Sequence, residues 1–389
     1  MKFVLYANTD WYLYNFRLST ALQLKQQGHD VVMVSPPGEF GARFAVHGLR
    51  WVQLAMDRAS LNPLREAATL RQLTRVLRAE RPDLLHNFTV KCAIYGALAA
   101  RAAGVPAVVN AVAGMGYVFC SDTLLARSLR PVVKLLMRGT LGSGRSRLIL
   151  QNPDDADAFI RARLVPQQSI RVIRSSGVDL ARFLPNGRAE GERRPLRVLL
   201  AARLLWEKGV GEYAEAARLL RAEGRNIEFV LAGMPDSGNP RSVRREDVEA
   251  WVREGLVDWR GHVDDMPALM RTADVMALPS YYREGVPKCL IEAAACGLAI
   301  VTTNLPGCRE VVSDDCVDGL HVEPRSARSL ADALARLDDD RELLARLGAC
   351  AREKALQHFD ERMVISKTIE VYDELLAGCR ADARETMHA

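Results

Sequence analysis

The chain has 389 residues and lacks the cysteine and histidine spacings of metal sites and disulfide frameworks. Its eight cysteines form no C-x-x-C pair. In a chain of this length they are typical of reduced cytosolic thiols. The seven histidines are scattered, without the spacing of zinc ligands. We therefore expect a protein without a metal ion or a resident cofactor.

Long apolar segments are also missing. Met1–Tyr6 meets a polar turn at Asn8 too early to form the core of a signal peptide. The longest uncharged run, Ala102–Ser121, contains three glycines, a proline and an asparagine. This composition favours a buried strand followed by a glycine-rich loop over a membrane span. The sequence thus predicts no transmembrane segment and a cytoplasmic location.

Signatures of nucleotide and nucleic-acid binding are absent as well. There is no G-x-x-x-x-G-K-[ST] motif, and neither half has a complete G-x-G-x-x-G in its first loop. P-loop phosphoryl transfer and hydride transfer therefore lack their usual motifs. Spaced zinc ligands and RNP-like aromatic strands are missing too, so we expect no nucleic-acid partner.

The charges are unevenly distributed along an otherwise ordinary globular composition of 49% hydrophobic and 26% charged residues. Residues 1–190 contain 25 Lys and Arg against 13 Asp and Glu, whereas residues 191–389 contain 28 against 35. A basic half joined to an acidic half suggests two domains with different partners. The basic half favours an anionic membrane surface or a phosphorylated ligand.

Short apolar runs alternate with amphipathic helical stretches, which predicts two doubly wound α/β domains. A polar, turn-rich segment at 184–195 is the best linker. We expect an N-terminal domain over 1–187, a C-terminal domain over 188–359, and a final helix within 360–389 that packs back on the first domain. The expected strands are 2–7, 30–35, 84–86, 107–111 and 147–151, then 196–201, 227–232, 257–259, 275–278 and 299–303; the expected helices include 17–27, 64–79 and 93–102.

Two cations follow the first strand of the second half. Arg203 and Lys208 lie where a strand ends and a helix begins, a place that offers free backbone N–H groups and a positive dipole. An arginine fork and a lysine point charge together suit a diphosphate. Two solvated surface cations are the alternative interpretation.

Two carboxylates follow a later strand. Glu284 lies in a loop, and Glu292 lies eight positions later in the predicted helix. A loop carboxylate can accept hydrogen bonds from sugar hydroxyls, and a carboxylate in the first helical turns can hold a ribose diol. The intervening backbone at Gly285 and Val286 can approach an anion closely. The alternative interpretation is an exposed helix acid and a partner of the helix dipole.

The pair Asp155 and Asp157 spells D-x-D, a metal-binding motif elsewhere. Here it follows Asn152 and Pro153. A helix that begins with an Asn cap, a proline and acids in its first turn explains the pair without a metal.

These motifs together resemble the retaining GT-B glycosyltransferases of family 4 over nearly the whole chain. The resemblance is carried by Arg203 with Lys208-Gly209, by Glu284 and Glu292 within P-S-x4-E-G-x-P, by the 177–183 stretch G-V-D-x3-F and by the 306–310 loop P-G-x-x-E. Segments 58–63, 86–91, 114–119 and 151–155 further resemble a bacterial subgroup that extends sugars on undecaprenyl diphosphate.

The resemblance implies a role for each matched residue. Arg203 and Lys208 bind the diphosphate of a nucleotide sugar, Glu292 the ribose and Glu284 the transferred sugar. Gly285, Val286, Pro287 and Leu290 complete the donor site. His86 matches the family histidine that reaches the donor sugar from the other domain across an interdomain cleft. In the first loop, Asp10, Tyr14 and Arg17 are the candidate acceptor contacts.

The expected chemistry is electrostatic. Because a nucleoside diphosphate is already a good leaving group, the main task is to stabilise its growing charge with two cations and a helix N-terminus. The resemblance implies retention, by same-face attack with the diphosphate taking the acceptor proton. The expected reaction moves an N-acetylhexosamine from a UDP-sugar to a polyprenyl-diphosphate-linked saccharide in surface polysaccharide synthesis. The alternatives are GDP-mannose or another nucleotide-sugar donor with a different acceptor, a sugar-nucleotide epimerase of the same fold, and a non-catalytic sugar-nucleotide-binding subunit.

A basic amphipathic stretch suggests which segment of the chain contacts the membrane. Residues 123–150 contain six cations and no acid, interleaved with leucines and valines. Such a helix can lie on an anionic leaflet. An ordinary sheet-covering helix with solvated cations is the alternative. We expect peripheral association with the cytoplasmic face of the inner membrane.

Overall fold

The computed structural model describes residues 1–57, 60, 62–114, 124–142, 144–185, 194–236 and 238–388. Within these ranges the chain forms two compact units, Met1–Ser176 with Arg362–Ala389, and Gly177–Glu361. No helix in these ranges has both the length and the apolar character needed to cross a bilayer. Nor do the side chains described there include three or more His, Cys, Asp or Glu residues grouped to hold a metal ion.

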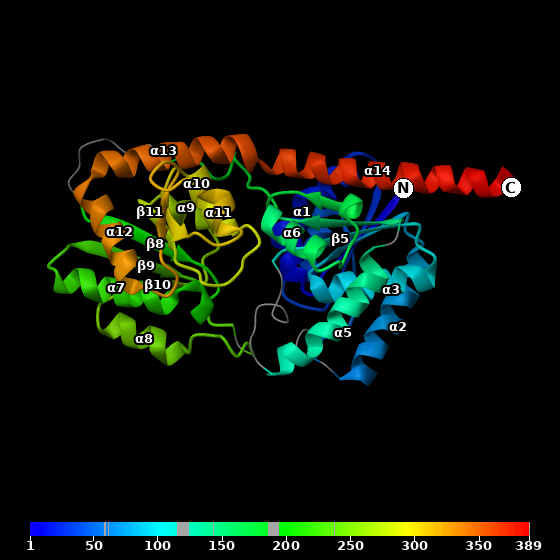
Figure 1. Ribbon diagram of the computed structural model, residues 1–389, viewed down its shortest axis with the longest axis horizontal. Helices are drawn as coiled ribbons and strands as arrows, with labels where there is room; N and C mark the ends of the chain where they lie inside the picture. The colour runs from blue at the N-terminus through cyan, green and yellow to red at the C-terminus, as the bar shows by residue number, and fades with distance from the viewer. Residues whose placement is uncertain are drawn as a thin grey trace. The chain divides into compact units, whose positions relative to one another are not determined.

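The first unit contains a parallel seven-stranded sheet in the described ranges, with order β3-β2-β1-β4-β5-β6-β7. Figure 1 labels its strand β5 among the helices of this unit. Its strands are β1 Lys2–Tyr6, β2 Asp30–Ser35, β3 Arg50–Gln53, β4 Leu84–Phe88, β5 Ala107–Val112, β6 Ser146–Leu150 and β7 Ile170–Val172. Its helices are α1 Asp10–Gln26, α2 Pro63–Glu80, α3 Val90–Ala103, α5 Leu124–Leu141, α6 Pro153–Arg161 and α14 Glu361–His388, with 3-10 turns η1 Gly41–His47 and η2 Gln167–Ser169.

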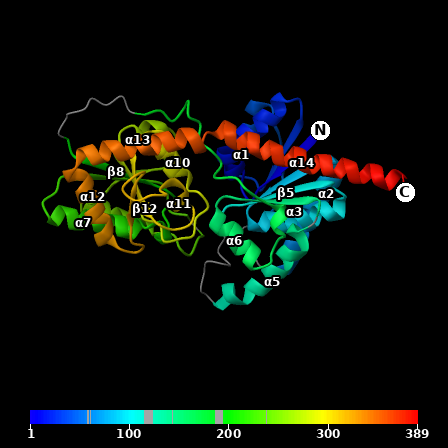
Figure 2. The ribbon, with the colours of Figure 1, turned by 45° about the horizontal axis from the view of Figure 1, so that its top comes forward.

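Alternation along the strands divides the core of this unit into layers. Phe3 and Leu5 of β1 face α1 and α14, whereas Val4 and Tyr6 face α2 and α3. Figure 2 shows α1 and α14 over one face of the sheet. Tyr372 of α14 is fully buried against Phe3, so the end of the chain completes the core of its beginning.

The second unit is a parallel six-stranded sheet in the described ranges, with order β10-β9-β8-β11-β12-β13. Its strands are β8 Leu196–Ala201, β9 Ile227–Ala232, β10 Asp258–Gly261, β11 Val275–Leu278, β12 Ala299–Thr303 and β13 Leu320–Val322. Its helices are α7 Val210–Ala222, α8 Arg245–Arg253, α9 Met266–Met270, α10 Lys288–Ala295, α11 Cys308–Val311, α12 Ala327–Asp339 and α13 Arg341–His358, with the 3-10 turn η3 Trp206–Lys208.

The strand order reverses between β1 and β4 in the first unit and between β8 and β11 in the second. In open α/β sheets, ligands bind beyond the carboxyl ends of the strands at such a reversal. We therefore expect a ligand-binding site in the loops after these four strands.

The division between the units falls at Ser176, earlier than the boundary expected at residue 187. Val178 already belongs to the second unit, because its N–H donates to Phe359 O at 2.8 Å and its carbonyl accepts from Glu361 N at 3.0 Å. Phe183 is also buried in the core of that unit. The polar segment 184–195, the expected linker, lies mostly outside the described residues, as does most of the 114–119 motif.

Several helix starts follow from local capping. Asn152 accepts from Asp155 N at 2.8 Å and precedes Pro153, which confirms the helical interpretation of the D-x-D pair. Helix α1 begins at Asp10 rather than at the expected Arg17, because Thr9 Oγ1 accepts from Tyr12 N at 3.1 Å. Arg17 therefore lies inside this helix.

Candidate active site

Lys208 and Glu284 meet in the second unit, at the reversal of its strand order. Lys208 ends the turn η3 after β8, and Glu284 lies in the loop after β11. The Lys208 ammonium pairs directly with the Glu284 carboxylate, and the two side chains are only 16% and 12% exposed. Ser280 Oγ lies 3.0 Å from Glu284 Oε1 and 3.0 Å from Glu207 O, so it ties the two loops together. The structure thus unites two residues that lie 76 positions apart.

Arg203 is held differently. Its Nη1 donates to Asp236 Oδ2 at 2.7 Å, and its side chain is 56% exposed. Asp236 follows β9, the strand next to β8, and its backbone N–H donates to Ser242 Oγ at 2.9 Å. Both expected diphosphate ligands therefore have carboxylate partners, and an incoming diphosphate would compete with those carboxylates for the same N–H donors.

Sequence reasoning missed three members of this cluster, Asp236, Ser280 and Glu207. The position of Asp236 after the neighbouring strand was a usable signal, because carboxyl ends of parallel strands share one sheet edge. Glu207 is half-buried, and burial raises its pKa, partly opposed by the charges of Arg241 and Lys208. No pattern in the sequence distinguished it from an exposed acid.

Glu292 lies on α10, with its carboxylate 3.8 Å from the Lys288 ammonium. Burial raises the pKa of Glu292 to about 7, opposed by the charges of Lys288 and Arg182. Gly285 and Pro287 precede α10, and Pro287 is its cap residue. Leu290 does not fit its expected role at a ligand, because its side chain is fully buried in the hydrophobic core. The Val286 side chain is also in that core, which leaves only its backbone for a ligand.

The pKa of Glu292 predicts a pH-dependent stability. A carboxyl group with a pKa raised from 4.5 to about 7 stabilises the folded state fully below pH 4.5, and this contribution is lost as the pH rises through 7. We expect the free energy of unfolding of a Glu292→Gln variant to decrease less than that of the native chain between pH 5 and 7.5, by on the order of 2 kcal/mol. Urea unfolding across this range measures the difference, and parallel curves for the two proteins would contradict it.

His86 occupies a different place from the one expected. Strand β4 continues beyond it to Phe88, and the period of two points His86 toward α1 and α14. Its ring is 1% exposed, and Nδ1 lies 2.6 Å from the Tyr372 hydroxyl. Burial, followed by the charge of Arg17, lowers the pKa of His86 well below its usual value. His86 is a buried, neutral residue at the wall of a narrow cavity, not an exposed group at a strand end.

The three candidate acceptor contacts in the first loop also separate. The buried Asp10 carboxylate accepts from the backbone N–H groups of Phe40 and Gly41, both at 2.8 Å, so it fixes a loop. Tyr14 packs against the Phe40 and Phe44 rings. Of the three, only Arg17 lines the cavity that contains His86.

The two halves of the chain match two families. Residues 16–175 match the glycosyl transferase 4-like domain, and residues 195–340 match the glycosyl transferases group 1. A curated relative, the N,N'-diacetylbacillosaminyl-diphospho-undecaprenol alpha-1,3-N-acetylgalactosaminyltransferase of Campylobacter jejuni, is 30% identical over 94% of this chain and 96% of its own. A UDP-Gal:alpha-D-GlcNAc-diphosphoundecaprenol alpha-1,3-galactosyltransferase of Escherichia coli is 29% identical over 82% of each chain.

Solved structures share the fold across both units. The sucrose-phosphate synthase of Thermosynechococcus elongatus matches with a TM-score of 0.79 at 20% identity, over 97% of this chain and 100% of its own. Anabaena HepE in complex with UDP-glucose matches with a TM-score of 0.77 at 19% identity, over 96% and 100%. The architecture is the GT-B fold, which confirms the expected class of two doubly wound α/β domains.

Proposed function

Since this chain belongs to the group 1 glycosyltransferases, with a glycosyltransferase 4-like first domain, we propose that it transfers an N-acetylhexosamine from a UDP-sugar to a polyprenyl-diphosphate-linked saccharide. The observation that carries this proposal is the similarity to the Campylobacter jejuni enzyme across almost the full length of both chains. The Escherichia coli relative, named for a diphosphoundecaprenol acceptor and a UDP-sugar donor, supports the same substrate classes.

The Lys208–Glu284 pair supplies the chemistry in this proposal. When the donor diphosphate binds, Lys208 moves from Glu284 to the phosphate oxygens. The Glu284 carboxylate is then free to accept hydrogen bonds from hydroxyls of the transferred sugar. Arg203 makes the same exchange from Asp236 to the diphosphate. The carboxylate partners fix both cations beside the ends of neighbouring strands, and fixed charges of this kind make electrostatic stabilisation effective.

The reaction follows the chemistry of the leaving group. The bond between the anomeric carbon and the diphosphate oxygen breaks, and the acceptor oxygen forms a bond to the same carbon. The acceptor proton goes to the departing diphosphate, on the same face of the sugar, so the configuration is retained. Lys208, Arg203 and the backbone around Gly285 stabilise the charge that develops on the diphosphate. Glu292 holds the ribose hydroxyls.

A substrate panel tests this function. The chain is incubated with UDP-, GDP- and other nucleotide sugars, each with and without an undecaprenyl-diphosphate-linked saccharide, and products are identified by mass and linkage. We expect a product only with a UDP-N-acetylhexosamine and the lipid-linked acceptor. Transfer from GDP-mannose would contradict the donor assignment. Conversion of the nucleotide sugar without an acceptor would indicate an epimerase instead.

Helix α5 is our proposed contact with the anionic membrane surface. Its inner face packs Met137 and Leu141 into the core, while Val132 and Leu135 are 54% and 70% exposed. Its exposed side also contains Arg127, and the helix has no acid. Such a surface suits an anionic leaflet, because its apolar side chains can insert between the lipids while its cations contact the headgroups. No acidic side chain has to be desolvated on contact.

This contact predicts the result of a sedimentation assay. A Val132→Asp, Leu135→Asp variant is expected to lower binding to anionic liposomes about thirtyfold, because each of the two exposed apolar side chains contributes about 1 kcal/mol in the interface. Val46→Asp is the matched control, since Val46 is 86% exposed but lies in η1. Equal partitioning of the native chain between anionic and neutral liposomes would exclude this surface.

A further inference from the structure

Arg17 is a buried cation without a counter-charge. Its side chain belongs to a residue only 6% exposed, and no carboxylate within the described ranges pairs with it. One guanidinium nitrogen, Nη2, donates to the Tyr12 hydroxyl at 3.1 Å, and the carbon of the group lies 4.5 Å from the centre of the Phe88 ring. Its Nε has no hydrogen-bond partner among the residues that the structure describes. Burial of an uncompensated charge is strongly unfavourable, so its retention needs an explanation outside the fold.

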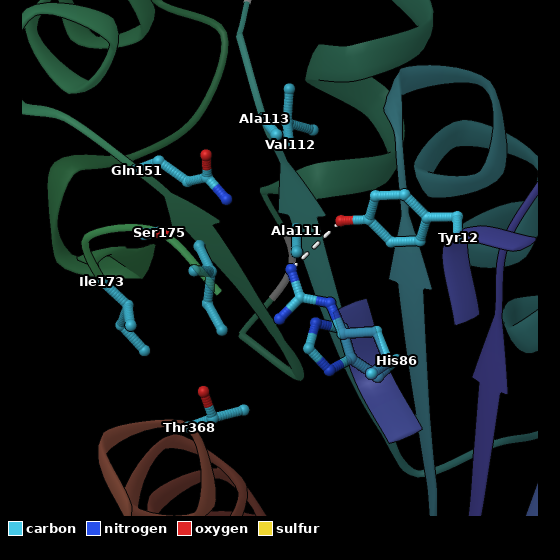
Figure 3. A pocket seen from close by; sticks show the side chains of 11 residues that line it. Tyr12, His86, Ala111, Val112, Ala113, Gln151, Ile173, Ser175 and Thr368 are labelled. Atoms are coloured by element: carbon cyan, nitrogen blue, oxygen red, sulfur yellow. Dashed lines mark hydrogen bonds between the residues drawn. The ribbon is translucent and has the colours of Figure 1, made fainter. Parts of the chain in front are cut away.

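A narrow cavity adjoins this guanidinium. It is lined by residues from four strands or their ends and from α1 and α14, among them Tyr12, His86, Gln151, Ser175 and Thr368 (Figure 3). The cavity has room for one group of the size of an oxygen atom, because the volume open to the centre of a water-sized sphere is about 10 Å³. The cavity borders β4, one of the two strands at the reversal of the strand order, near which open α/β sheets bind ligands.

His86 adds a second unsatisfied polar atom to the same wall. Its Nε2 is buried without a partner in the described part of the chain, while Nδ1 lies 2.6 Å from the Tyr372 hydroxyl. If Nδ1 carried the proton, the Tyr372 hydroxyl hydrogen and Nε2 would both lack partners. If Tyr372 donates to Nδ1, only the Nε2 proton remains unpaired. The second arrangement leaves fewer unsatisfied groups and makes His86 a neutral donor at the cavity.

Ser175 supplies a third unsatisfied polar atom to the wall of the cavity. Its hydroxyl is buried and has no hydrogen-bond partner within the described ranges, and its backbone has a φ of +66°. Non-glycine residues reach this left-handed region at a cost, and such residues gather at functional sites. A glycine would relieve the backbone there but would remove the hydroxyl. Three buried donors, one of them cationic, therefore line the wall of a cavity the size of one oxygen.

We propose that this cavity binds one anionic oxygen of a phosphoryl group, with Arg17, His86 and Ser175 as its donors. A water molecule has the right size, but it leaves the guanidinium charge uncompensated. An oxyanion supplies the charge and accepts from all three donors at once. The choice of a phosphoryl group rests on the proposed function, because both proposed substrates contain a diphosphate.

Pyrophosphate binding tests the site directly. The titration is done by calorimetry on a Lys208→Ala background, which weakens the other candidate diphosphate site. Adding Arg17→Met is expected to weaken pyrophosphate binding about tenfold or more, while the melting temperature stays the same or rises because a buried charge is removed. Adding Ser175→Gly is expected to weaken binding about two- to tenfold without lowering the melting temperature.

Two results would overturn the site. Unchanged pyrophosphate affinity in both variants would show that the cavity holds a structural water only. A lowered melting temperature for Arg17→Met with unchanged affinity would make Arg17 a structural cation. Should Arg17→Met fail to fold, the NMR resonance of His86 Nε2 in the native chain still tests whether pyrophosphate binds in the cavity. It is expected to shift on pyrophosphate addition, and a fixed resonance contradicts the proposal.

Further titrations identify the source of the phosphoryl group. An effect of Arg17→Met on farnesyl diphosphate affinity, without one on UDP affinity, assigns the oxygen to the lipid acceptor; the reverse assigns it to the donor. An effect on neither overturns the assignment to a substrate. These titrations are independent of turnover, so absence of transfer in the substrate panel would contradict the proposed function while the binding result for Arg17 stood.

Discussion

Replacing Lys208 with alanine is expected to lower kcat at least a hundredfold. In our proposal the Lys208 ammonium neutralises the departing diphosphate together with Arg203, and removal of one such electrostatic group typically costs a factor of 10² to 10³. The 16% exposure of the side chain means that water replaces it poorly. Initial rates with saturating donor and acceptor measure the effect.

The control must separate chemistry from folding. Removing Lys208 leaves the mostly buried Glu284 carboxylate without its partner, which itself destabilises a protein. A Lys208→Met, Glu284→Gln double variant removes both charges and is expected to fold but to remain inactive. Arg244→Ala, which removes an exposed cation of the same unit, is expected to keep native turnover. Native turnover in both Lys208→Ala and Glu284→Ala would refute the catalytic assignment.

Gly307→Ala is expected to abolish most activity through the backbone. Gly307 has a φ of +87°, and a Cβ there would lie 1.4 Å from Gly285 O and 2.7 Å from Glu284 O. The loop that holds Glu284 against Lys208 must therefore move. We expect kcat/KM to decrease at least a hundredfold and the melting temperature to decrease by about 6–12 °C, as a cost of roughly 3 kcal/mol in a unit of this size implies.

Gly224→Ala is the matched control for this substitution. Gly224 also has a positive φ, +75°, but a Cβ there meets nothing within 4 Å. It should therefore show the modest cost of the backbone conformation and retain the native kcat/KM. Similar losses of activity in the two variants would mean that the contact with the Glu284 loop is unimportant.

The alternation of apolar runs predicted the two sheets and most of their strands, because buried parallel strands are almost continuously hydrophobic. It missed β3, β7 and β13, which are the short outer strands of their sheets. Their exposed edges permit polar residues, as in Arg50–Gln53, so hydrophobicity gave no signal. The start of α1 was missed because its first turn depends on one hydroxyl, that of Thr9.

The sequence predicted which residues belong to the candidate site but not which of them contact one another. Sequence spacing placed Lys208 and Glu284 after strands, and the structure shows that the two strands are neighbours. That pairing depends on the order β8-β11, which no local pattern encodes. The location of His86 was wrong for a related reason. Which face of β4 it occupies, and that Tyr372 from the far end of the chain covers it, are tertiary facts.

The contribution of α14 to the first unit also bears on how the protein is made. Val364, Val371, Tyr372 and Leu375 are buried in the core that begins with Phe3 and Leu5. All of Gly177–Glu361 is synthesised before these side chains leave the ribosome. The part of the first sheet's apolar face that α14 covers therefore stays uncovered while the second unit is synthesised, although α1 already packs on that face. The core of the oldest part of the nascent chain is thus completed only after the whole second unit has been synthesised.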